Sequence, residues 1–100
     1  RENLWKVTLH AQKAFKERGY ETRHTQSPII PLFVRDTIKA MKIVRLAYEK
    51  GVFITPVIAP AVPEKDVLIR FALMATHTCE QVDEAVDKLT DIFKELEVIA

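Results

Sequence analysis

An arginine stands in the middle of an apolar segment, VLIRFALM, at residues 67–74. Its β-branched and aromatic residues favour a strand. Because successive side chains of a strand point to opposite faces, Arg70 shares its face with Leu68, Ala72 and Met74, while the other face is entirely apolar. A guanidinium is always charged and offers five hydrogen-bond donors, so it is costly to bury without a partner. Arg70 must therefore reach water, a carboxylate of this chain or an external anion.

Two interpretations of Arg70 follow from the residues alone. In the first, it is a surface arginine that forms a local ion pair with Glu64 or Asp66. In the second, it is a clamp that binds the carboxylate of a ligand in a bidentate manner, a role that suits its planar fork of donors. The residue pattern leaves both interpretations open.

The rest of the sequence alternates between helical and strand patterns. The periodicity predicts helices over 3–18 and 37–50 and a third helix after Thr78, with strands over 28–34, 52–59 and 67–74. Thr78 and Gln81 have the spacing of a capping box, and Gly19 and Gly51 fit the left-handed position after a helix end. The two later strands are joined by a short loop and should pair antiparallel. We therefore expect an α+β fold, with a small, mainly antiparallel three-stranded sheet and helices packed on one face.

The middle helix has two overlapping sets of apolar residues. We expect Asp36 to cap this helix and its core-facing stripe to be formed by Ile38, Met41, Val44 and Tyr48, with Ala40, Ile43 and Ala47 widening the stripe.

Composition excludes several classes of function. The 15 basic and 14 acidic residues are interleaved and give a net charge of +1, so we expect no nucleic-acid partner. We also expect no membrane-spanning segment. Cys79 is the only cysteine, which favours a reducing compartment, and we expect a cytoplasmic protein. The chain opens on Arg1 within helical pattern, so we interpret it as a piece of a longer protein.

No metal or catalytic constellation stands out. His10, His24 and His77 lack the mutual spacing of metal ligands, and Cys79 stands alone. We expect His77, just before the helix cap, to make local hydrogen bonds. We predict no metal-binding, cofactor-binding or catalytic residue in this chain.

Several consecutive motifs point to one family. SPIIPLFVRD at 27–36, the order P-x-V-P at 60–63, the strand that ends in Ile69 and Arg70, and MATHT at 74–78 opening an acidic helix together resemble the C-terminal domain of the α-oxoamine synthases. These pyridoxal-phosphate enzymes include serine palmitoyltransferase, glycine C-acetyltransferase and 8-amino-7-oxononanoate synthase. The resemblance implies a C-terminal small domain over 1–100, with a linking helix and loop at 1–26 and an α+β core at 27–100.

The resemblance also implies an activity for the whole protein. Such enzymes condense a small amino acid, glycine or serine, with an acyl-CoA, and pyridoxal phosphate acts as the electron sink. The arginine at the position of Arg70 holds the carboxylate of the amino acid. The lysine that carries the cofactor lies in a missing upstream domain, so the fragment alone should be inactive. The resemblance further implies a homodimer.

The sequence departs from the family at two places. Lys65 and Asp66 follow Glu64 where many relatives have a glycine, and Ile58 occupies a position where some serine palmitoyltransferases carry a second arginine. The alternative to the enzyme is a stand-alone α+β regulatory or interaction module without catalysis, in which Arg70 forms a surface ion pair.

Overall fold

The computed structural model describes residues 2–23 and 25–100, so His24 and Arg1 lie outside the described residues. All the predicted helices and strands are present. In chain order, they are α1 (Glu2–Glu17), β1 (Ile29–Phe33), α2 (Thr37–Glu49), β2 (Thr55–Val57), the 3-10 helix η1 (Glu64–Asp66), β3 (Leu68–Ala72) and α3 (Cys79–Glu95). None of the described helices is long and apolar enough to cross a membrane.

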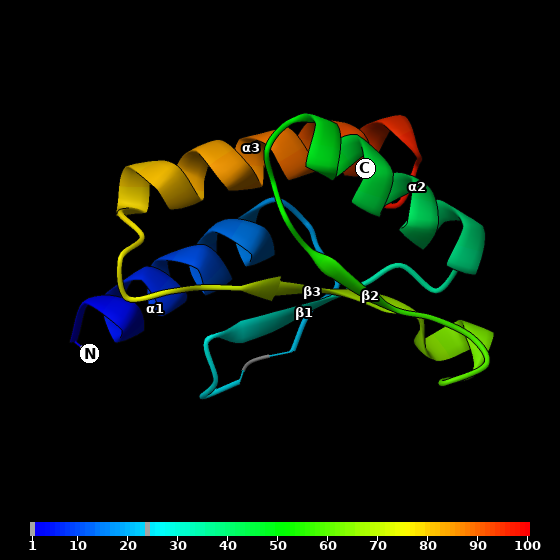
Figure 1. Cartoon of the computed structure of the whole chain (residues 1–100), viewed down its shortest axis with the longest axis horizontal. Helices are drawn as coiled ribbons and strands as arrows, with labels where there is room; N and C mark the ends of the chain where they lie inside the picture. Colours follow the sequence, from blue (N-terminus) through cyan, green and yellow to red (C-terminus); the bar gives the residue numbers. More distant parts are fainter. Residues whose placement is uncertain (1, 24) are drawn as a thin grey trace.

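The strands form one antiparallel sheet with β3 in the centre, in the order β1-β3-β2 (Figure 1). Arg70 lies opposite Pro31 of β1 and Thr55 of β2, so these three residues form a row across the sheet. The strand expected over 52–59 is shorter than predicted, because its first residue closes the end of α2 instead. The Val52 N–H donates a hydrogen bond to the Ala47 carbonyl at 2.8 Å.

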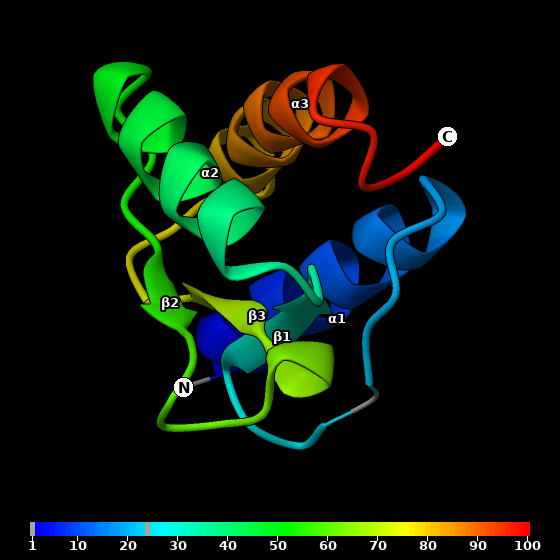
Figure 2. The ribbon, with the colours of Figure 1, turned by 90° about the vertical axis from the view of Figure 1, so that its right-hand side faces the viewer.

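The helices cover one face of this sheet, as the sequence predicts. Figure 2 shows α2 and α3 above the strands and α1 beside α3. The two longer helices bury apolar stripes against each other and against β3, and the ring centroids of Phe15 and Phe71 are 5.0 Å apart. The residues that make up these stripes are Val7, Ala11 and Phe15 on α1, and Val82, Val86, Leu89 and Phe93 on α3. The result is the predicted α+β architecture, in which the opposite face of the sheet is free of helices.

The prediction for the buried face of α2 was partly wrong. Ala40, Ile43 and Ala47 are buried, whereas Ile38 and Tyr48 are 70% and 68% exposed. Both sets of residues recur at helical spacing, so periodicity alone could not rank them. The structure selects the set with two alanines, because small side chains let α2 lie close to α3 and the sheet.

The predicted helix ends are confirmed. Asp36 accepts a hydrogen bond from the Lys39 N–H at 2.9 Å, and Thr78 and Gln81 form both hydrogen bonds of a capping box. Gly19 and Gly51 have φ values of 85° and 82°, a left-handed conformation that glycine adopts without steric cost.

Polar contacts fasten α1 to the start and the outer side of α3. The Asn3 side chain donates hydrogen bonds to the carbonyls of Ala75 and His77, in the turn that precedes α3. Farther along α1, His10 contacts Asp83 at 2.7 Å and Arg18 contacts Asp87 at 2.8 Å. The first helix of the chain is therefore held by a segment that follows it by about seventy residues.

Candidate functional site

Arg70 lies at the centre of the sheet face that the helices leave open. Val67, Ile69, Phe71 and Leu73 are buried, whereas Arg70 and Ala72 are exposed. This alternation is the one predicted from the strand pattern. The charged side chain therefore points away from the helical layer, and desolvation does not oppose its charge.

The guanidinium of Arg70 makes few polar contacts with the described residues. Its Nε donates a hydrogen bond to Oγ1 of Thr55, its cross-strand neighbour, at 3.2 Å. Among residues 2–23 and 25–100, no carboxylate forms an ion pair with it. The outer edge of the guanidinium, formed by its two terminal nitrogens, is the part that would bind a carboxylate with two parallel hydrogen bonds.

The two carboxylates that could have paired with Arg70 have other partners. Glu64 accepts hydrogen bonds from the Thr37 N–H at 2.6 Å and from the Thr37 hydroxyl at 2.8 Å. Asp66 lies 3.9 Å from a terminal nitrogen of Arg35. The local ion pair of the first interpretation is therefore not formed among the described residues. Both carboxylates belong to η1, the short helix that precedes β3.

A network around Arg35 contains the strongest ionic contacts near the open face. Arg35 donates hydrogen bonds to both carboxylate oxygens of Glu21 and to the Lys65 carbonyl. Its guanidinium lies 4.6 Å from the centroid of the Phe33 ring. The hydrogen bonds from Arg35 lower the pKa of Glu21, and the same contact raises the pKa of Arg35. No residue pattern predicted this network, which depends on a bend at Arg35 with φ of 62°.

Two of the remaining titratable side chains, His77 and Tyr20, make contacts within the fold. Among the described residues, no group of three or more His, Cys, Asp or Glu side chains is placed to hold a metal ion. His77 Nδ1 accepts a hydrogen bond from the Met74 N–H at 2.9 Å, which confirms the local role predicted for it. Burial raises the pKa of Tyr20 to about 12, and its hydroxyl contacts Thr90 at 3.1 Å inside the core. These groups therefore support the fold.

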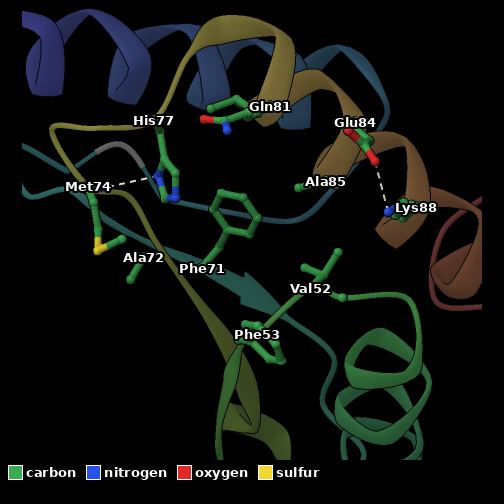
Figure 3. A pocket seen from close by; sticks show the side chains of 12 residues that line it. Val52, Phe53, Phe71, Ala72, Met74, His77, Gln81, Glu84, Ala85 and Lys88 are labelled. Atoms are coloured by element: carbon green, nitrogen blue, oxygen red, sulfur yellow. Dashed lines mark hydrogen bonds and ion pairs between the residues drawn. The ribbon is translucent and has the colours of Figure 1, made fainter.

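A cavity of about 460 Å³ opens beside the carboxyl end of β3 (Figure 3). Its lining comes from the segment after α2, from the end of β3 and from the first turns of α3. The residues that Figure 3 labels include Val52, Phe53, Phe71, Ala72, Met74, His77, Gln81, Glu84, Ala85 and Lys88. Sequence reasoning missed this cavity, because the residues at 51–53 and at 81–88 come together only through the packing of α2 on α3. The MATHT motif at 74–78 was noted in the sequence, and its Met74 and His77 line one end of the cavity.

Comparisons with known proteins identify relatives over nearly the whole chain. No family model matches. The chain is 53% identical to a serine palmitoyltransferase of Bacteroides ovatus over 98% of its length and 25% of the relative. It is 31% identical to an 8-amino-7-oxononanoate synthase of Treponema denticola, again over 98% of the chain and 25% of the relative.

A solved structure of serine palmitoyltransferase with PLP has the same fold. It superposes on 99% of this chain with a TM-score of 0.91, and the match covers 25% of that protein at 23% sequence identity. The helices and strands described above are therefore arranged as in one quarter of that enzyme. The chain thus matches the C-terminal part of the serine palmitoyltransferases and 8-amino-7-oxononanoate synthases, as its sequence resemblance predicts, and it spans about a quarter of the length of these relatives.

Proposed function

We propose that this chain is the C-terminal small domain of a pyridoxal-phosphate-dependent acyltransferase that condenses an amino acid with an acyl-CoA. In this proposal, Arg70 binds the carboxylate of the amino acid. The observation that carries it is the free guanidinium edge of Arg70 on an open sheet face, with no resident carboxylate among the described residues. The match to the relatives over 98% of the chain supports it independently.

The division of work between this chain and the rest of the enzyme follows from the residues present. Pyridoxal phosphate, when bound, withdraws electrons from the α-carbon of the amino acid. We propose that a large domain outside this chain holds the cofactor. This chain contributes a fixed cation on a strand, which orients the amino acid through its carboxylate. Orientation by a rigid cationic clamp converts binding energy into rate.

Serine and a long acyl chain are the substrates we propose. The relative with 53% identity carries serine and palmitoyl in its name, whereas the 8-amino-7-oxononanoate synthase is 31% identical. We also propose that the intact protein is a cytoplasmic homodimer and that residues 1–100 alone are inactive, because half of the site lies elsewhere.

Arg70→Ala in the intact enzyme tests the proposed clamp. Losing a charged hydrogen-bonded pair costs roughly 2–4 kcal/mol, so the KM for the amino acid should rise about 30- to 700-fold. The KM for acyl-CoA should change little. Arg45→Ala is the matched control, because Arg45 is an exposed arginine on α2, away from the open sheet face. Unchanged steady-state kinetics for Arg70→Ala would exclude the clamp.

A further inference from the structure

The cavity beside β3 ends in two hydrogen-bond donors that have no acceptor among the described residues. The first is His77. Its Nδ1 accepts the Met74 N–H, so in the neutral imidazole the proton is on Nε2. His77 is one of the lining residues, and Figure 3 shows its ring beside Phe71 with Nδ1 turned to Met74. The other ring nitrogen is therefore a donor at this end of the cavity.

The second donor is the side-chain amide of Gln81. The capping box fixes its orientation, because Oε1 accepts the Thr78 N–H at 3.0 Å and Thr78 Oγ1 accepts the Gln81 N–H at 3.1 Å. The NH₂ group is then the free end of the amide. In Figure 3 this nitrogen points from α3 toward the space above Phe71.

The middle of the cavity is lined by apolar side chains. The ion pair between Lys88 and Glu84 lies at the end opposite His77 and Gln81. Lys88 donates to the Lys50 carbonyl at 2.9 Å and contacts Glu84 at 3.0 Å. This pair joins α3 to the end of α2 and leaves no free charge of Lys88 for a ligand. Between the pair and the donors, the walls are formed by side chains that include Val52, Phe71, Val82 and Ala85. An apolar body with an acceptor oxygen at one end matches this lining.

We propose that this cavity binds an acyl chain whose carbonyl or carboxylate oxygen accepts hydrogen bonds from His77 and Gln81. Ala72 lines the cavity and lies on the same strand face as Arg70. Two residues along a strand span about 7 Å, so Ala72 lies that far along β3 from the carboxylate clamp, whereas Phe71 lies on the opposite, helical side of the sheet. Two ligands share this chemistry, an acyl thioester and a free fatty acid. Only the assignment to the acyl donor rests on the proposed function, whereas binding of an acyl chain does not.

The test is titration of the intact protein with octanoate and, separately, with the N-acetylcysteamine thioester of octanoic acid. Heteronuclear NMR should show saturable shifts at the Gln81 side-chain amide, the His77 ring and the Phe71 ring. Saturation by the thioester assigns the cavity to the acyl donor, and saturation by octanoate alone assigns it to a fatty acid that is not consumed. Absence of saturable shifts with both ligands overturns the proposal.

Two variants separate the specific site from weak apolar binding. Gln81→Glu keeps the capping box, since glutamate also accepts the Thr78 N–H, but it removes the donor and adds a negative charge. We expect octanoate to bind at least about tenfold more weakly to it. Ala85→Leu fills the apolar wall and should abolish saturation by either ligand. Glu95→Gln, at the opposite end of α3, is the control and should bind as the parent chain does.

Unchanged affinity in both Gln81→Glu and Ala85→Leu would overturn the assignment even if shifts are seen. Arg70→Ala makes the result independent of the proposed function. It should leave binding of the uncharged octanoyl thioester intact, because the thioester has no carboxylate for Arg70 to bind, whatever the effect on the amino-acid kinetics of the intact enzyme. A failed clamp and a failed acyl site therefore give different results.

Discussion

Arg35 and Arg70 lie on the same small sheet, one just after β1 and the other at the centre of β3, yet they have opposite surroundings. Arg35 contacts both oxygens of Glu21, the Lys65 carbonyl and the Phe33 ring. Among residues 2–23 and 25–100, Arg70 has one hydrogen bond, from Nε to the Thr55 hydroxyl. The first guanidinium joins three segments of the chain, whereas the second has its outer edge free. An arginine that is already paired stabilises the fold, and one that is unpaired on an open face is available to a ligand.

The largest expected effect comes from giving Arg70 a resident partner of the kind Arg35 has. Thr55→Glu places a carboxylate in the cross-strand position, where Cβ atoms are about 5 Å apart. This carboxylate should occupy the guanidinium and raise the KM for the amino acid in the intact enzyme at least about tenfold. Steady-state kinetics measure the effect, and Thr55→Gln is the uncharged control. Equal KM values for the Glu and Gln variants would contradict the availability of Arg70.

A smaller effect on the KM for the amino acid is expected when residue 70 keeps its positive charge but loses the planar, two-donor edge of the guanidinium. Arg70→Lys retains a cation that cannot form two parallel hydrogen bonds with a carboxylate. The KM for the amino acid should rise about tenfold, less than for Arg70→Ala. Wild-type kinetics in the lysine variant would show that charge alone is sufficient.

Removing the paired arginine should affect folding and not substrate binding. Arg35→Ala loses the contacts to Glu21 and Lys65 and should lower the Tm of the chain. Arg35→Gly loses the same contacts but adopts the φ of 62° without steric cost, so its Tm should fall less than that of the alanine variant. Arg70→Ala should change stability by less than about 0.5 kcal/mol, as surface substitutions usually do. Differential scanning calorimetry would distinguish these, and an equal Tm loss at both arginines would refute the contrast.

The smallest expected effect is a pH dependence that comes from Glu21. Its pKa is lowered in the folded chain because Arg35 donates hydrogen bonds to its carboxylate. The stabilisation is therefore fully present above the ordinary pKa of a glutamate, about 4.3, and is lost as the pH falls through the lower folded value. Urea unfolding should show a decrease in the free energy of unfolding over this acidic range. The decrease should be smaller in Glu21→Gln, and an identical profile would remove Glu21 from the explanation.

The contrast between the two arginines also shows what the sequence could predict. The exposed position of Arg70 followed from strand alternation, because Val67, Ile69 and Phe71 could only form the buried face. The ends of the helices followed from Asp36, Thr78 and the two glycines. These are local rules, in which a few neighbouring residues determine the outcome.

Features that depend on packing between distant segments could not be predicted in this way. The buried face of α2 was centred on the wrong residues, since Ile38 and Ala40 both belong to apolar sets at helical spacing. The pairing of Arg35 with Glu21 requires a left-handed bend at a residue other than glycine. The cavity requires α2 and α3 to meet. The role of Arg70 could not be predicted from its position alone. An unpaired arginine on an open face can bind an anion, and only experiment identifies that anion.

The docking of α1 on α3 has a consequence for synthesis on the ribosome. The Val7, Ala11 and Phe15 side chains are covered mainly by elements that are translated much later, and Asn3 receives its partners only when residues 75–77 have emerged. At about 5–20 residues per second, the apolar side of this helix stays uncovered for several seconds. A nascent chain thus exposes the apolar side of α1 as a temporary chaperone-binding segment, which disappears once α3 has left the exit tunnel.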